Sequence, residues 1–172
     1  DYLLIGGTVR RRKDLNVFFN TLEPRKFNIK QFPISPSMAN LIWNKLHFLP
    51  VEFFTGKIDV FHSSDWSQPP SYAYKVTTIH DLVPLKFPEL SHPKVVSTHI
   101  ARLNRVKEEV DMVIVPSETT KRDLIKYGFD LKKIKVIPEA PDPSFKPASI
   151  DACNKIRKKY QIEGKFLLAV GI

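Results

Sequence analysis

The segment "DMVIVPSETTKRDLIKYGFDLKKIKVIPE" (111–139) decides the fold class. It begins with an apolar run at 111–116 that shows no alternation, which is typical of a strand covered on both faces of its sheet. Ser117 then caps a helical segment that Gly128 ends, and 133–139 is the next strand. A strand, a helix and a second strand joined by short connections predict a parallel α/β unit.

The same alternation extends toward the N-terminus. Strands are expected at 2–7, 57–62 and 75–81, and helical pieces at 36–56. A long helix is expected from Lys94 to about Val110, with one face apolar and its charged residues, including Arg102, elsewhere. The sequence therefore predicts an α/β fold in which a mainly parallel sheet carries helices on both faces.

A proline-rich stretch, "PEAPDPSFKP" (138–147), separates this unit from the C-terminal segment of the chain. Its four prolines in ten residues are incompatible with regular structure, so it is expected to be a linker. We expect one domain at 1–147, and at 148–172 the start of a second, truncated domain. That start consists of a helix at about Ile150 to Tyr160 and a strand at 165–172.

The charge of the chain favours an anionic partner. There are 27 Lys and Arg against 18 Asp and Glu, a net charge of +9. Because basic and aromatic residues are not interleaved on neighbouring strands, no nucleic-acid partner is expected. The basic run 10–13 follows the first strand and suggests contact with an anionic membrane surface. The single cysteine, Cys153, fits a reducing compartment. The expected location is the cytoplasm, with peripheral association at the inner membrane face.

Polar side chains gather where the predicted strands end. Because the carboxyl ends of parallel strands meet at one sheet edge, these residues form the candidate site. Gly6 and Gly7 end the first strand, where they would let a ligand approach the backbone. Structural roles are also open: His80 can donate to a loop carbonyl, Asp81 can cap a turn, and Trp43 and Trp66 can be packing anchors. The candidate residues are His62, Ser63, Asp65, His80, Asp81, Ser117 and Glu118.

Three ordered motifs carry a resemblance to a known family. They are "TIHDLVPLKFPE" (78–89), "VPSETTKRDL" (115–124) and "KIKVIPEAPDPSF" (133–145). Together they resemble the N-terminal domain of the retaining glycosyltransferases of family four, a group with the GT-B fold that includes mannosyltransferases. The similarity runs from about Asp59 to the end and extends more loosely back to Tyr2.

The resemblance implies a Rossmann-like, acceptor-binding half of an enzyme that transfers a sugar from a nucleotide-diphosphate sugar to a hydroxyl acceptor, itself a sugar or a lipid-linked molecule. The motif histidine matches His80, with Asp81 beside it, and these are the expected catalytic residues. Acceptor binding is expected from His62, Ser63, Asp65, Ser117 and Glu118. No cofactor or metal is expected. The donor-binding domain is expected beyond residue 172, and the family's glycine-rich loop before Asp1.

The sequence departs from the family pattern in the linker. Glu139 and Ala140 stand where Asn and Gly are common in the family. Because the difference is confined to the linker, it does not alter the predicted fold. We expect the chain to fold as given, without transferase activity of its own.

Two other functions fit the same residues. His62, Asp65, His80 and Asp81 are nitrogen and oxygen ligands suited to a divalent metal, so a metal-dependent hydrolase is one alternative. A non-catalytic module that binds anions through its basic segments is the other.

Overall fold

The computed structural model describes residues 2–9, 12–20 and 27–169. The chain divides into two compact units, Asp1–Pro138 and Glu139–Ile172. Each unit is described by itself.

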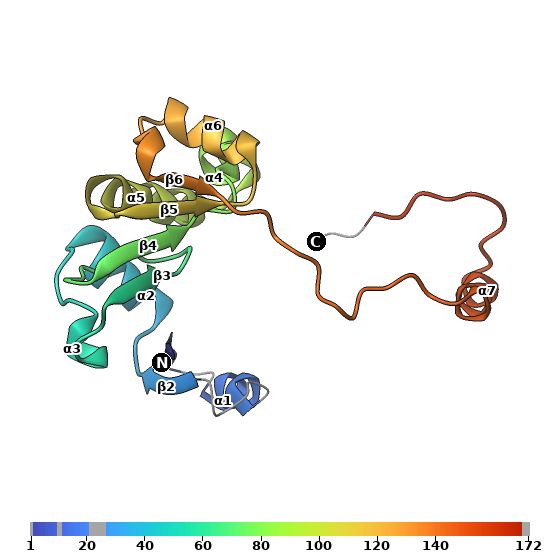
Figure 1. Cartoon of the computed structure of the whole chain (residues 1–172), viewed down its shortest axis with the longest axis horizontal. Helices are drawn as coiled ribbons and strands as arrows, with labels where there is room; N and C mark the ends of the chain where they lie inside the picture. The colour runs from blue at the N-terminus through green and yellow to red at the C-terminus, as the bar shows by residue number, and fades with distance from the viewer. Residues whose placement is uncertain (1, 10–11, 21–26, 170–172) are drawn as a thin grey trace. The chain divides into compact units, whose positions relative to one another are not determined.

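A four-stranded parallel sheet is the centre of the first unit (Figure 1). Its neighbouring strands, in order, are β3 (Val60–Ser63), β4 (Tyr74–Thr78), β5 (Met112–Val115) and β6 (Ile134–Val136). All three pairings are parallel, which confirms the predicted α/β class. Since the strands run the same way, the residues that follow β3, β4 and β5 emerge at one edge.

Helix α5 (Pro93–Glu109) and helix α6 (Glu118–Lys126) build the main core against this sheet. Ser117 caps α6 by accepting a hydrogen bond from the Thr120 amide, as predicted, and Gly128 follows the helix with φ +82°. Burying each core aliphatic side chain is worth about 1.5–3 kcal/mol. The buried core consists of Ile79, Leu82, Leu103, Val106, Val110, Val113, Val115, Leu124, Phe129 and Ile134.

One prediction about α5 is wrong. Arg102 was expected among the charged residues of its polar surface, but the side chain is completely buried. The helix faces the sheet with apolar residues and faces the ends of β3 and β4 with this arginine. The hydrogen bonds that it makes there compensate for removing its charge from water.

A second sheet pairs β1 (Tyr2–Gly7) in parallel with β2 (Phe27–Phe32) and is accompanied by α1 (Arg12–Asn20). The sequence predicts β1 but not β2 or α1. Where β2 ends, Phe32, Ile34 and Trp43 form a small second core, with Phe54 stacked on Phe32 at 4.6 Å between ring centroids.

Short helices and turns complete the first unit. The segment 36–56 forms α2 (Pro36–Ala39), the π-helix η1 (Asn40–Lys45) and α3 (Glu52–Thr55). The N-cap of α2 is Ser35, whose hydroxyl accepts from the Met38 amide. After β4 come α4 (Val83–Lys86) and the 3-10 turn η2 (Pro88–Leu90), and the 3-10 turn η3 (Leu131–Lys133) precedes β6.

The second unit contains helix α7 (Ile150–Lys159), close to the predicted bounds, with Cys153 exposed on it. The proline-rich stretch 138–147 contains no helix or strand, as expected. The strand predicted at 165–172 is not formed over 165–169, and the remaining three residues lie outside the described part. Leu167 and Leu168 are exposed, and a strand without a hydrogen-bonded neighbour has no partner for its amides.

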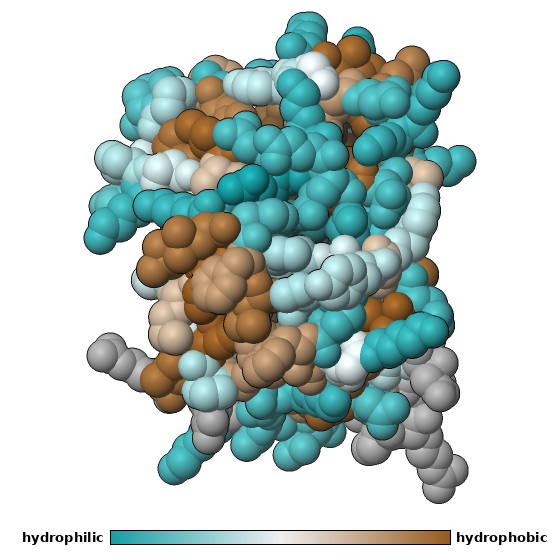
Figure 2. Space-filling view, turned by 90° about the vertical axis from the view of Figure 1, so that its left-hand side faces the viewer, coloured by the Kyte–Doolittle hydropathy of each residue, from teal (hydrophilic) through white to brown (hydrophobic). Residues whose placement is uncertain are grey.

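Within the described ranges, no helix is both long enough and apolar enough to cross a membrane. The space-filling view shows one face of the molecule, on which apolar side chains gather in a patch between hydrophilic regions (Figure 2).

Arg10 and Arg11 of the basic run lie outside the described residues, as does the side chain of Arg12. Lys13 is exposed on α1.

Candidate functional site

The candidate site is the edge at which β3, β4 and β5 end. His62 lies in β3, and its Nε2 is 3.0 Å from the hydroxyl of Thr78 at the end of β4. His80 and Asp81 follow β4 by two and three residues, and both are exposed. The structure therefore places His62, His80 and Ser117, which follows β5, at one edge.

The buried side chain of Arg102 holds this edge together through hydrogen bonds to the residues at the ends of β3 and β4. From α5, its guanidinium donates to the Ser64 carbonyl through Nε at 3.1 Å and to the Asp65 carboxylate through Nη1 at 3.1 Å. Nη2 donates to the Thr77 hydroxyl at 2.6 Å and to the Thr78 carbonyl at 3.2 Å. One fully buried side chain thus ties the segment after β3 to the end of β4. Its burial lowers its pKa to about 10, partly opposed by the charge of Asp65.

Four ionisable side chains interact around Asp65. Burial raises the pKa of the Asp65 carboxyl, and the charge of Arg102 opposes that rise, as His99 and His80 do when they are protonated. Asp81 acts on the same carboxyl as a like charge. Burial also lowers the pKa of His99, which favours its neutral imidazole. Because the charges of Asp65, Arg102, His99, His80 and Asp81 interact, we treat these residues as one electrostatic cluster.

The backbone around His80 is held by two neighbours. Asp81 Oδ1 accepts a hydrogen bond from the Val83 amide at 2.8 Å, which is the turn-capping role open to it from the sequence. The Thr120 hydroxyl lies 3.2 Å from the His80 carbonyl and donates to it. Ser117 caps α6 and lies 3.0 Å from the same hydroxyl of Thr120, so it reaches the site through Thr120.

Two of the predicted acceptor-binding residues, Ser63 and Glu118, lie in surroundings that differ from each other. Ser63 is buried, and its hydroxyl lies 2.6 Å from Gln68 Oε1 and 2.7 Å from the Thr77 hydroxyl. It is thus part of the hydrogen-bond network around Arg102. Glu118 is exposed on the first turn of α6 and approaches Lys121 at 3.8 Å, a contact of little energetic weight.

The two tryptophans differ from each other. Trp43 is buried, and its indole N–H donates to the Leu49 carbonyl at 3.1 Å, as expected of a packing anchor. Trp66 is 56% exposed and lies against the His99 ring, with 5.0 Å between the centroids. The packing role proposed for Trp66 is therefore wrong.

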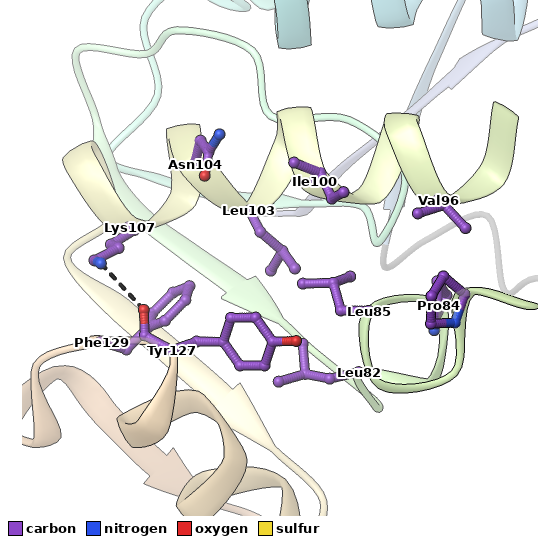
Figure 3. Close-up of a pocket in the computed structure, with 11 residues that line it drawn as sticks. Leu82, Pro84, Leu85, Val96, Ile100, Leu103, Asn104, Lys107, Tyr127 and Phe129 are labelled. Carbon is purple, nitrogen blue, oxygen red and sulfur yellow. Dashed lines mark hydrogen bonds between the residues drawn. The ribbon is translucent and has the colours of Figure 1, made fainter. Parts of the chain in front are cut away.

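Among the described residues of the unit, cavities also lie away from this edge. One, of about 350 Å³, lies between α4, α5 and the end of α6, and its lining is mostly apolar (Figure 3). Its one basic group, Lys107 Nζ, donates to the Tyr127 carbonyl at 3.1 Å. The other, of about 320 Å³, lies beside Gly6, Gly7 and Thr8. A Cβ on Gly6 would come within 2.8 Å of Leu15, so this glycine makes room for α1 rather than for a ligand.

The structure provides no set of ligands for the metal ion of the alternative hydrolase, within the residues that it describes. Throughout the described part of the chain, no group of three or more His, Cys, Asp or Glu side chains is arranged to hold a metal ion. His62 points to a hydroxyl, and Asp65 binds a guanidinium.

Two residues of the cluster, His99 and Arg102, were not predicted from the sequence. Both lie on α5, about twenty residues after His80. A charged residue three positions from His99 on an amphipathic helix has the pattern of an ordinary solvent-exposed side chain. One feature of the sequence points to the burial of Arg102: on a helical projection, position 102 lies next to the apolar Leu103 and Val106 and not on the opposite face.

The comparison with protein families agrees with this architecture. The profile of Glycosyltransferase Family 4 matches residues 7–145, which is more than half of the chain. The chain therefore belongs to Glycosyltransferase Family 4, and its α/β unit is the Rossmann-like domain of that family. No curated protein matches the chain at a significant level.

Proposed function

We propose that this chain is the N-terminal, acceptor-binding half of a retaining GT-B glycosyltransferase that moves a hexose from a nucleotide-diphosphate sugar to a hydroxyl acceptor. The observation that supports it most is the cluster of His80, Asp81 and Asp65 at the carboxyl edge of a parallel sheet, held from below by buried Arg102. Ligands of open parallel sheets bind at this edge. A role in carbohydrate biosynthesis follows from such an activity.

In this proposal, His80 hydrogen-bonds a hydroxyl of the donor sugar while positive charge develops on the ring and the nucleoside diphosphate leaves. A hydrogen-bonding group fixed before the reaction stabilises developing charge without reorganising. The links from Thr120 and Asp81 to the backbone around His80 supply that rigidity. His62, Asp65, and Ser117 with Glu118 at the start of α6, lie on the acceptor side of the proposed site.

Replacing His80 tests the function. In the complete enzyme, His80→Ala is expected to lower kcat about 100-fold or more, because one preorganised group is lost. Its melting temperature should stay near wild type, since the side chain is exposed. His92→Asn is the matched control: that histidine caps α5, and asparagine also caps helices. Normal turnover in His80→Ala would contradict the proposal.

The donor is assigned to a second domain that begins after the proline-rich linker, at residue 148, and includes α7. The 172-residue chain alone is then expected to bind nucleotide-sugars no more tightly than the millimolar range, about −4 kcal/mol. Calorimetric titration measures this directly, and micromolar binding would show that the donor site lies in this half.

Contact with the cytoplasmic face of an anionic membrane is also proposed, from the net charge of +9. Each basic residue near such a surface is worth about 1 kcal/mol. Co-sedimentation with anionic vesicles at low salt, lost at high salt, is the expected result. Its absence at low salt would rule out the membrane contact.

A further inference from the structure

Trp66 holds its exposed position through a rigid backbone. Its amide donates to the Ser64 hydroxyl at 3.3 Å, and its carbonyl accepts from Asn44 Nδ2 at 2.9 Å. Asn44 is 2% exposed and also accepts from the Gln68 amide at 2.9 Å, so a buried side chain clamps the segment on both sides of Ser67. An indole presented on a fixed backbone costs little ordering entropy when it binds a ligand.

The surroundings of Trp66 combine an aromatic face with hydrogen-bonding groups. His99 lies against the indole, and its lowered pKa keeps the imidazole neutral, so it can donate from one ring nitrogen and accept at the other. Asp65, the residue before Trp66, binds Arg102 through Oδ1, and its side chain remains 32% exposed. A carboxylate accepts strong, charge-assisted hydrogen bonds from hydroxyl groups.

We propose that Trp66, His99 and Asp65 form a platform that binds the pyranose ring of an uncharged sugar acceptor. This inference rests on the proposed transferase function and names the substrate class of its acceptor site. A pyranose has C–H bonds on one face and hydroxyls around its rim. The C–H face matches the electron-rich face of an indole, and the rim hydroxyls match a carboxylate and an imidazole.

The charges of the cluster favour a sugar over other partners of an exposed tryptophan. The Asp65 carboxylate balances the charge of Arg102, and Asp81 adds a negative charge beside it, so the platform has no excess positive charge with which to hold the phosphates of a nucleotide or an anionic lipid. The Arg102 guanidinium does not face solvent: it is fully buried and donates its hydrogen bonds to protein oxygens. The platform therefore offers an anion no accessible guanidinium.

Saturation-transfer NMR on the whole chain tests the platform without relying on tryptophan emission. The probes are methyl α-D-mannopyranoside, methyl β-D-glucopyranoside and methyl β-D-galactopyranoside, with sorbitol as the open-chain control and UDP as the nucleotide control. At least one pyranoside is expected to receive saturation, strongest at the C–H protons of one ring face. Sorbitol and UDP are expected to receive none.

Substitutions assign the signal to Trp66. Trp66→Ala and Trp66→Leu are expected to weaken pyranoside binding about tenfold, because both lose the aromatic face, whereas Trp66→Phe retains most of it. Tyr72→Ala is the matched control, since Tyr72 is 85% exposed but precedes β4, at the opposite end of that strand. Unchanged binding in Trp66→Ala, binding of UDP instead of pyranosides, or no pyranoside binding would overturn the platform.

Transfer assays on the complete enzyme separate this inference from the function on which it rests. Trp66→Ala is expected to raise the KM for the acceptor about tenfold and to leave the donor KM unchanged, whereas His80→Ala lowers kcat. If His80→Ala keeps full turnover while Trp66→Ala loses pyranoside binding, the catalytic proposal fails and the platform stands. If His80→Ala loses turnover while pyranosides bind Trp66→Ala normally, the platform fails and the catalytic proposal stands.

Discussion

The two parallel sheets of the first unit end in different ways. At the carboxyl edge of the β3–β6 sheet, polar side chains are tied together by a buried arginine that donates to the strand ends. At the end of β1, Gly6 lies against Leu15 and Phe19 of α1 instead, and Gly7 lies against Ile34, which follows β2. A strand end with suitable residues therefore becomes a candidate site only when buried groups hold those residues in place.

The largest expected effect comes from removing the buried arginine. Arg102→Met is expected to lower the free energy of unfolding by about 3–5 kcal/mol, because it leaves the Asp65 carboxylate and two strand-end carbonyls without their donor. Urea denaturation measures the loss. Arg105→Met is the matched control on the same helix, since Arg105 is 31% exposed, and about 1 kcal/mol is expected there. Equal losses in the two variants would show that Arg102 is no special support.

Most of the four-stranded sheet could be predicted from the sequence. The unalternating run at β5 and the β-branched residues before His80 have a pattern that is typical of parallel strands. β2 was missed because "FNIKQF" mixes polar and apolar residues, and the structure leaves half of it exposed. The strand expected at 165–172 was wrong over 165–169 because local propensity cannot supply the neighbour that a strand needs.

The site was predicted less completely. Strand-end positions suggested His62, His80 and Asp81, since sequence order fixes which residues follow a strand. The sequence could not reveal the burial of Arg102 or the exposure of Trp66, because both depend on segments that approach from more than twenty residues away. Helical periodicity places a residue on a face but does not say what that face meets.

A smaller loss of stability is expected from a substitution at the end of β1. Gly6→Ala is expected to destabilise the chain by about 1 kcal/mol, because the new Cβ would meet Leu15 Cδ2 at 2.8 Å. Leu15→Val in the same chain should recover part of the loss, since it shortens the opposing side chain. A double-mutant cycle by thermal unfolding gives the coupling between the two positions. Additive losses would mean that Gly6 does not make room for α1.

The smallest expected effect is a pH dependence caused by two histidines, His62 in β3 and His99 on α5. The pKa values of His62 and His99 are lowered from 6.5 by burial, so the unfolded chain takes up protons before the folded chain does. Stability should therefore fall as the pH drops below about 6.5. Urea midpoints measured between pH 7.5 and 5.5 check this, as a range of about two units around the ordinary histidine pKa.

The control for this dependence is the double variant His62→Gln, His99→Gln. It should lose part of the slope, because the two groups that titrate differently in the folded and unfolded chains are gone. An unchanged slope would assign the pH dependence to other groups.

The contacts of α5 also determine when the first half of the unit can become stable. Arg102 reaches partners 24 to 38 residues earlier, and Arg105 donates to the carbonyls of Asn44 and Lys45, 61 and 60 residues earlier. During synthesis, η1 and the end of β3 therefore leave the ribosome well before the helix that completes their hydrogen bonds. These long closures cost chain entropy before they return stabilisation, so they slow folding. Until α5 emerges, the nascent β3 and β4 lack their anchor and are exposed to mispairing with other strands.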